Sequence, residues 1–407
     1  MRSQTLFVVC VAFATFCSCA RQEQAHVPGV DLGPGGVLLV CQSQFASDAQ
    51  GNPVPQPARL ELIRALDGRW DRAVLQDSMS NVFHKSIIDV SDGDTALFTI
   101  GGDDAALTKW RIGHVPSQPE RIWHPSFGGK HNRVRDIERG DVDGDGRPEL
   151  VMATHDQGVV AVADEIDGDW QITVVDSAPS TFVHEIEIGD LDRDGHLEFY
   201  ATPSKPNRAS GVSQPGAVLQ FRWDGSQYAR TVVDSFPDTH AKEILVADLD
   251  GNGDELYVVK EAVTSAEAPE PLVPVTIVRY QHAGVDWQKD EVCTIPDRQC
   301  RFLLTSDLDG DGRPELVAAT FKAGLWLIAP TPIPPWRREL IDAESSGFEH
   351  ACVTADMDGD GAQELYVASD DQKELRSYRH TEGRFVRTAL LPMEGDGITW
   401  GLTAGRM

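Results

Sequence analysis

The chain has 407 residues, enough to bury a large core, and no shift in composition or low-complexity linker divides it into separate domains. Its 64 acidic and 36 basic residues give a formal net charge of −28. Nucleic acids and anionic membrane surfaces are bound through clustered Lys and Arg, so this charge argues against both as partners. The composition therefore favours one large acidic domain.

The first residues have the layout of an export signal. One Arg precedes an apolar run of about a dozen residues, which is too short to span a membrane. Phe16-Cys17-Ser18-Cys19 resembles a lipobox with Cys19 as the lipidated residue, whereas Ser18-Cys19-Ala20 fits a small-x-small cleavage site. We expect a signal peptide over 1–19, a short linker over 20–30 and the folded domain over 31–407. The protein would be an outer-membrane or cell-surface lipoprotein, or a periplasmic or secreted protein.

Four cysteines follow the signal. Cys293 and Cys300 bracket a Pro-Asp turn, and a local disulfide between them would suit an oxidising compartment. Cys41 and Cys352 are expected to be buried thiols.

Five similar segments divide the chain at intervals of 49 to 59 residues. They are DVDGDGRPEL from Asp141, DLDRDGHLEF from Asp190, DLDGNGDELY from Asp248, DLDGDGRPEL from Asp307 and DMDGDGAQEL from Asp356. Alternating or apolar stretches flank each Asp/Gly loop and predict two strands joined by a turn. The period suits one four-stranded propeller blade per repeat.

A second recurring signal raises the number of blades to seven. About 30 residues after each loop, an aromatic residue begins a stretch of alternating polar and apolar residues, which is typical of the outer strand of a blade. Two more stretches of this kind, which begin at Trp70 and Arg121, precede the first loop. Residues 398–405 copy the strand before a loop, and residues 36–41 copy the strand after one. We therefore expect the last blade to be closed by strands from both ends of the chain, which removes exposed sheet edges.

These repeats resemble those of FG-GAP/VCBS and integrin-α propellers, and the resemblance covers nearly the whole mature chain. It implies an all-β fold: a seven-bladed β-propeller closed by N- and C-terminal strands, with calcium-binding DxDxDG loops. A closed propeller needs no partner for stability, so we expect a monomer. Fold alone does not define function.

The pattern D-x-D-x-D-G-x-x-E predicts a calcium site in each loop. Alternate Asp side chains converge on one cation, Gly lets the backbone curl, and a carbonyl and the later Glu complete a shell of hard oxygen ligands. The alternative is a solvated acidic turn, in which crowded carboxylates would repel one another. The loop at Asp248 is one residue shorter than the others. We expect four to five structural Ca²⁺ ions, with these ligands: Asp141, Asp143, Asp145, Glu149; Asp190, Asp192, Asp194, Glu198; Asp248, Asp250, Asn252; Asp307, Asp309, Asp311, Glu315; Asp356, Asp358, Asp360, Glu364.

Cations and imidazoles recur where the inner strands should begin. The Asp loops lie on one rim, so the inner strands start at the opposite rim beside the axis, which we call the axial mouth. A cationic residue or a histidine occupies the position six residues before the first Asp of each loop: Arg135, His184, Lys242, Arg301 and His350. Three further histidines belong to the same region: His84, His131 and His240. Three interpretations remain open: polar strand ends, a funnel for an anionic or polyhydroxylated ligand, or a catalytic metal held by histidines.

Two functions follow from these interpretations. The first is an exported, calcium-stabilised propeller that binds a glycan, a small anionic molecule or an envelope protein at the axial mouth. The alternative is an enzyme (lyase, dehydratase, isomerase or oxygenase) with a site at the mouth and a transition metal at the axis. Its catalytic residues would be His84, His184, His240, His350, Arg135 and Arg301. No G-x-S-x-G, P-loop or H-E-x-x-H motif supports other chemistry.

Overall fold

The computed structural model describes residues 36–66, 69–91, 94–111, 119–129, 132–205, 213–265, 270–284 and 286–406. Every regular element in these ranges is a β-strand, and the described chain holds no helix that could cross a membrane. The expected signal peptide, the linker and the anchor residue Cys19 lie outside the described residues, as does His131.

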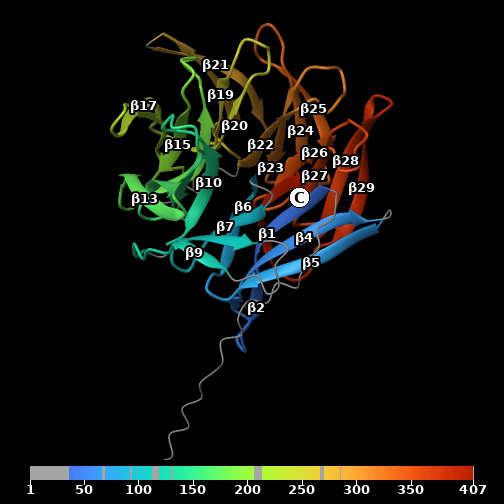
Figure 1. Ribbon diagram of the computed structural model, residues 1–407. Coiled ribbons are helices and arrows are strands. Elements are labelled where there is room, and N and C mark those ends of the chain that lie inside the picture. The colour runs from blue at the N-terminus through green and yellow to red at the C-terminus, as the bar shows by residue number, and fades with distance from the viewer. Residues whose placement is uncertain are drawn as a thin grey trace, which may run out of the picture.

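Seven four-stranded antiparallel sheets surround a central axis as the blades of a propeller (Figure 1). Six blades are each built from four consecutive strands. Blade 1 comprises β6 (Val82–Ser91), β7 (Asp94–Gly102), β8 (Ala106–Arg111) and β9 (Glu120–Trp123). Blade 2 comprises β10 (Val134–Gly140), β11 (Glu149–Thr154), β12 (Val160–Ile166) and β13 (Asp169–Asp176). Blade 3 comprises β14 (Phe182–Gly189), β15 (Glu198–Ser204), β16 (Gly216–Trp223) and β17 (Tyr228–Phe236).

The second half of the ring repeats this pattern. Blade 4 comprises β18 (Ala241–Ala247), β19 (Glu255–Lys260), β20 (Val275–Ala283) and β21 (Asp286–Ile295). Blade 5 comprises β22 (Cys300–Ser306), β23 (Glu315–Thr320), β24 (Leu325–Ala329) and β25 (Arg337–Asp342). Blade 6 comprises β26 (Cys352–Ala355), β27 (Glu364–Ser369), β28 (Glu374–Thr381) and β29 (Arg384–Pro392). The all-β, seven-bladed architecture expected from the repeats is confirmed.

Blade 7 joins segments from opposite ends of the sequence. Its strand order is β30 (Ile398–Arg406), β1 (Gly36–Ser43), β4 (Ala58–Leu66) and β5 (Arg69–Asp77), and β30 pairs antiparallel with β1. A short hairpin, β2 (Phe45–Ser47) and β3 (Pro53–Pro55), is inserted between β1 and β4 and belongs to none of the seven blades. It follows the end of β1, so it projects from the rim of the axial mouth.

The apolar core lies between neighbouring blades. All six residues of β11, β23 and β27 are buried, which explains why the segment after each Asp loop is almost continuously apolar. One cluster joins Phe98 and Ile100 of blade 1 to Ile137 and Met152 of blade 2. The expected disulfide is wrong: Cys293 and Cys300 are free buried thiols on strands of different blades.

A β-bulge recurs near the start of the inner strands. In β10, Val134 pairs with Thr154 and Asp136 with Ala153, so Arg135 is an extra residue with no partner opposite. The same irregularity in β6, β14, β18, β22 and β30 produces a set that we call the bulge ring: His84, Arg135, His184, Lys242, Arg301 and Trp400. A bulge changes the direction in which its side chain points. The common register therefore brings six side chains to one level of the axis.

Candidate functional site

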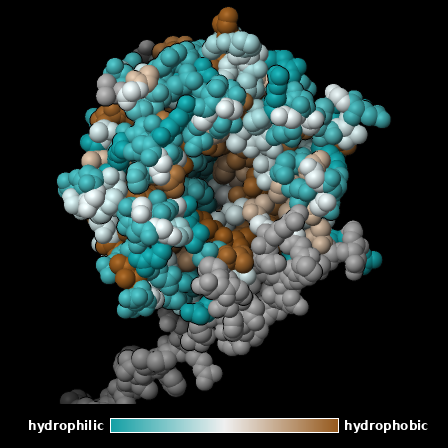
Figure 2. Space-filling model, turned by 45° about the horizontal axis from the view of Figure 1, so that its top comes forward, coloured by the Kyte–Doolittle hydropathy of each residue, from teal (hydrophilic) through white to brown (hydrophobic). Residues whose placement is uncertain are grey.

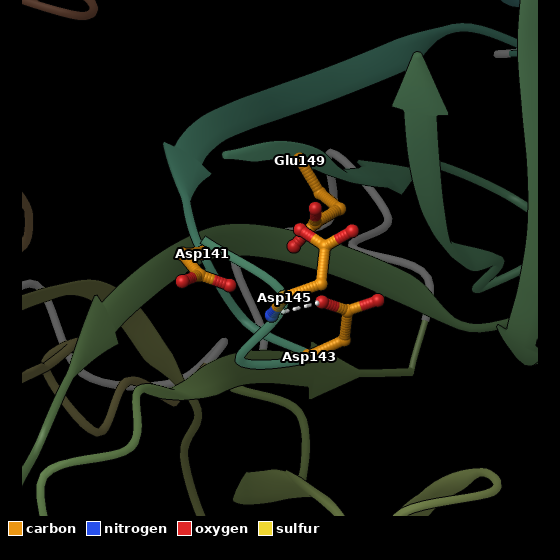
Figure 3. Close-up of side chains that lie close together, drawn as sticks. All are labelled: Asp141, Asp143, Asp145 and Glu149. Carbon is orange, nitrogen blue, oxygen red and sulfur yellow. Dashed lines mark hydrogen bonds between the residues drawn. The ribbon is translucent and has the colours of Figure 1, made fainter. Parts of the chain in front are cut away.

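The first Asp loop has the geometry of a cation site. Asp141, Asp143 and Asp145 follow β10, Glu149 opens β11, and one oxygen from each lies within 4.8 Å of the others (Figure 3). Gly146 has a φ of 90°, a left-handed conformation that disfavours other residues, and its N–H donates to Asp141 Oδ2 at 3.0 Å. The turn therefore needs Gly to direct its carboxylates inward.

Three further loops hold the same kind of group within the same 4.8 Å limit. The groups are Asp190, Asp192, Asp194 and Glu198; Asp307, Asp309, Asp311 and Glu315; and Asp356, Asp358 and Asp360. These four clusters are acidic sites that could hold a metal ion.

Buried carboxylate oxygens without partners show that the residues fit calcium. Glu149 Oε2 accepts the N–H of Val142 at 2.9 Å, whereas Oε1 is buried and has no hydrogen-bond partner. Oε1 of Glu198 and Oε1 of Glu364 also lack a hydrogen-bond partner, although the latter lies 3.7 Å from Arg379 Nη1. Burial raises the pKa of Glu149 and Glu198 to about 7. A divalent cation bound by the Asp side chains and the terminal Glu would supply the missing partner and keep these groups ionised.

The fifth loop differs from the other four. Asp248 and Asp250 belong to no group of three acidic, His or Cys ligands in the described chain, and Asn252 would have to supply an amide oxygen. The terminal Glu255 is engaged at the oxygen that lacks a hydrogen bond in Glu149 and Glu198, since its Oε1 accepts from Gln281 and lies 3.5 Å from Arg279. The sequence signal for this difference was the missing spacer residue.

Arginines distinguish the four acidic groups further. Arg222 bridges Asp192 and Asp194, and Arg379 bridges Asp358, at 3.0 Å, and Asp360. In the first loop Arg147 forms a salt bridge with Asp145, at 2.7 Å, and with no other carboxylate of that loop. Two loops thus carry a guanidinium that a bound cation would have to displace.

At the axial mouth, one carboxylate serves two arginines. Glu349 is buried, and its oxygens lie 3.3 Å from Arg135 Nη2 and 3.1 Å from Arg301 Nη1. Arg135 also lies 3.5 Å from Glu185. Glu349 was missed in the sequence because it does not stand at the repeated position six residues before a loop, which is occupied by His350.

His84 lies between two further guanidinium contacts. Its Nδ1 is 3.4 Å from Arg135 Nη1 and its Nε2 is 3.4 Å from Arg133 Nη1. The Trp400 ring meets it edge-on at 4.6 Å. Burial and the two arginines hold the pKa of His84 well below its usual range, so the imidazole is neutral.

A hydrogen-bonded chain links Lys242 to blade 3. Its Nζ lies 3.1 Å from His184 Nδ1, and His184 Nε2 lies 2.7 Å from Ser204 Oγ. When Lys242 is charged it can only donate, so that Nδ1 is the acceptor and Nε2 carries the ring proton. Burial and the neighbouring Arg301 lower the pKa of Lys242 to about 7.

Two buried groups beside Lys242 have unpartnered atoms. His240 stacks on His184 at 5.0 Å, and its Nδ1 has no hydrogen-bond partner. Glu261, which follows β19, has an unpartnered Oε1, and burial raises its pKa to about 7. The same burial lowers the pKa of His240 to about 3. The site thus contains an acid and a base that both titrate near neutrality.

His350 lies apart from these groups. Its φ of 58° is left-handed, its Nε2 lies 2.7 Å from Ser345 Oγ, and its Nδ1 lies 2.7 Å from the Thr320 carbonyl. Both ring nitrogens of His350 are therefore within hydrogen-bond distance of groups that belong to the blades. The structure therefore brings together His84, His184, His240, Arg135 and Arg301, but not His350.

This arrangement does not favour a transition metal at the axis. In the described chain, groups of three or more metal-ligating side chains occur only in the Asp loops. The nitrogens of His84 face two guanidinium groups, and those of His184 contact Lys242 and Ser204. Nearby cations would repel a metal ion.

Below the bulge ring, acidic side chains extend along the inner strands. Lys85 contacts Asp136 at 3.0 Å and also Glu138. Glu187 and Glu243 belong to the same group, and burial holds the pKa of each well above its usual range. Figure 2 shows a hollow at the centre of the ring with both hydrophilic and hydrophobic side chains in its wall. Charge therefore changes sign along the axis, from cations at the mouth to carboxylates deeper in.

The comparisons with known proteins agree with this architecture. Residues 141–201 match the FG-GAP-like repeat family, and this segment contains the loops at Asp141 and Asp190. The match and the seven-bladed ring together support the resemblance to FG-GAP/VCBS β-propellers that the repeats indicated. No curated protein matches the chain.

Several solved structures share the fold at low sequence identity. A putative 6-phosphogluconolactonase from Bacteroides fragilis is 12% identical, with a TM-score of 0.56 over 93% of this chain and 100% of that one. A protein from Lactobacillus plantarum is 8% identical, with a TM-score of 0.57 over 91% and 99% of the two chains. A putative 6-phosphogluconolactonase from Bacteroides uniformis is 10% identical, with a TM-score of 0.54 over 91% and 100%. At these identities the likeness concerns the fold alone.

Proposed function

We propose that this protein is a calcium-stabilised β-propeller that binds a small anionic ligand at the axial mouth. The single observation that carries the proposal is the bulge ring, which repeats one backbone irregularity to bring Arg135, Lys242 and Arg301 to the axis. All three are buried. A fold built only for stability would not need to concentrate buried cations at one level.

The charges at the mouth are incompletely balanced. Four cationic side chains, Arg133, Arg135, Lys242 and Arg301, face three carboxyl groups, Glu349, Glu185 and Glu261. With a pKa of about 7, Glu261 carries only part of a negative charge near neutrality. Burying a cation without a counter-ion is costly, and the depressed pKa of Lys242 reflects that cost. A bound anion would remove the imbalance through charge-assisted hydrogen bonds.

Export and anchoring remain predictions from the first residues. The site would then face a periplasmic or extracellular space, and the partner would be a free anionic metabolite or an anionic group on a glycan or envelope protein. Calcium in the Asp loops would hold the blades and take no part in ligand binding.

Isothermal titration with sodium sulfate at constant ionic strength tests the proposal, because sulfate keeps its charge across the neutral pH range. We expect binding to the wild-type protein and at least a tenfold loss of affinity in Lys242→Met and Arg301→Met, since each removes a charged donor. Arg384→Gln is the matched control, because Arg384 is exposed on β29 at the outside of blade 6. Equal affinities in all four proteins would overturn the proposal.

A second candidate function is acid–base catalysis on a ligand in the mouth. It is favoured by the Lys242–His184–Ser204 chain beside Glu261, because a base and an acid that titrate near neutrality suit proton transfer. Incubating the protein with D-galacturonate in D₂O and following deuterium incorporation at carbon by NMR tests it. Incorporation that is lost in Glu261→Gln would support an enzyme, and no incorporation would leave the binding function alone.

A further inference from the structure

A cavity of about 330 Å³ lies beside the axial mouth, between blades 7, 1 and 2. Its walls come from segments far apart in sequence. Its lining residues are Ser43, Phe45, Pro55, Asn81, Val82, Gly102, Asp103, Asn132, Arg133 and Trp400. The volume is at the small end of the range for small-molecule sites, so it suits a ligand about the size of a monosaccharide.

The β2–β3 hairpin builds one wall of this cavity. Phe45 and Pro55 are cross-strand partners in the hairpin, and both line the cavity. The hairpin belongs to none of the seven blades. The hairpin adds no strand to a blade, but it adds an aromatic side chain and a Pro to the wall of the cavity. Ligand binding explains such an insertion more simply than stability does.

The polar lining matches a ligand with several hydroxyl groups. Asn132 is 5% exposed, donates to Asp104 at 2.9 Å, and has an Oδ1 without a hydrogen-bond partner. Asn81 donates to Asp103. Amides and carboxylates together offer donors and acceptors at neighbouring points, which is what hydroxyl groups require because each both donates and accepts.

Arg133 connects the cavity to the bulge ring. Its Nη1 lies 3.4 Å from His84, which in turn contacts Arg135, and its guanidinium lies 5.7 Å from the centre of the Trp400 ring. Burial lowers the pKa of Arg133 to about 10, so it remains charged at neutral pH. An anionic group at the mouth and a hydroxylated body in the cavity could therefore belong to one molecule.

We infer that the cavity binds the hydroxylated ring of a sugar acid, with its carboxylate directed toward Arg133 and the axial cations. This inference rests on the proposed anion binding and narrows the ligand class. Phe45 and Pro55 cover the apolar face of the ring, Asn81, Asp103 and Asn132 bind its hydroxyl groups, and the carboxylate supplies the negative charge that the mouth lacks.

Three matched probes test this inference by isothermal titration: D-galacturonate, D-galactose and cyclohexanecarboxylate. Galactose has the hydroxyl groups without the carboxylate, and cyclohexanecarboxylate has the carboxylate on a ring without hydroxyl groups. We expect galacturonate to bind at least tenfold more tightly than either. D-glucuronate is measured in parallel, and either uronate counts as support.

Variants then assign the binding to the cavity. Asn132→Leu should reduce the affinity for galacturonate at least tenfold while sulfate binding is retained. If Asn132→Leu fails to fold, Phe45→Ala is the second variant, because it changes only the inserted hairpin. Val54→Ala is its control, since Val54 is on the same hairpin, is 41% exposed and does not line the cavity.

Failure of this inference differs from failure of the proposed function. Sulfate binding without a preference for a uronate over cyclohexanecarboxylate would overturn the sugar-acid inference and keep the anion site. Equal affinities for galactose and galacturonate would also overturn the sugar-acid inference. So would a higher affinity for L-glutamate, an anion without a sugar ring, than for either uronate. Absence of sulfate binding would instead reject the axial anion site itself.

Discussion

Charged side chains cluster both in the Asp loops and at the axial mouth, but their charges are neutralised in different ways. In the loops, carboxylates converge within 4.8 Å and leave buried oxygens without partners, a state that a metal ion completes. At the mouth, the Glu349 carboxylate already contacts Arg135 and Arg301, and Lys242 hydrogen-bonds to the neutral imidazole of His184. The comparison teaches that an external ion would complete the loops, whereas the charged groups of the mouth already have partners within the protein.

Removal of calcium should have the largest effect. A bound calcium ion would stabilise the fold by about 2.7 kcal/mol at each site when free calcium is a hundredfold above its Kd, and the contributions of several sites would combine. We expect EGTA to lower the melting temperature by many degrees in differential scanning calorimetry, with recovery on adding CaCl₂. Addition of NaCl to the same ionic strength is the control for screening. Unchanged melting in EGTA would mean that the acidic loops are solvated turns.

Glu349→Gln should produce the largest effect at the mouth. It removes the carboxylate shared by two buried arginines, and breaking such a pair costs about 3–5 kcal/mol. We expect a lower free energy of unfolding in urea, together with tighter sulfate binding and a stability gain on adding sulfate. If the variant loses stability but sulfate binds no better, the arginines serve structure rather than ligand binding.

The affinity for sulfate should fall as the pH rises from 6 to 8.5. Lys242, with a pKa of about 7, loses its positive charge in this range, and Glu261, also at about 7, gains a negative one. Both changes weaken anion binding. His240 has a pKa of about 3 and His184 one well below its usual range, so both stay neutral. Calorimetric titration of sulfate should show roughly a tenfold decrease, about 1.4 kcal/mol. The decrease should be much smaller in Lys242→Met.

The smallest effect concerns the loops that carry an arginine. Arg222 bridges Asp192 and Asp194, so calcium must displace it, and Arg222→Gln should tighten binding at that loop. An exposed ion pair contributes up to about 1 kcal/mol, which corresponds to a gain of about fivefold or less. Calcium titration should resolve it against Arg384→Gln as the control. Weaker binding in Arg222→Gln would mean that the guanidinium supports the loop.

The sequence predicted the ring better than it predicted the mouth. Five Asp loops at regular intervals, together with the recurring aromatic that opens each outer strand, predicted seven blades and their strand order, because hairpin neighbours are local in the chain. The position six residues before each loop also identified four members of the bulge ring, Arg135, His184, Lys242 and Arg301, whereas the fifth residue, His350, lies apart. Glu349 could not be found this way, because it reaches the axis only where β26 begins late and His350 takes a left-handed conformation. The hairpin cavity was equally invisible, since it joins residues more than 350 positions apart, such as Ser43 and Trp400.

The pairing of β30 with β1 sets an order of events for folding. Six blades are built from contiguous segments, whereas the seventh requires residues 398–406 to meet residues 36–43 across almost the whole chain. Contacts of such sequence separation form late, because the entropy of closing the intervening loop is lost before the contact forms. Until then β1 offers an unpaired edge to other chains. Trp400 lies on β30, so the wall of the cavity beside the axial mouth would be completed only in this final step.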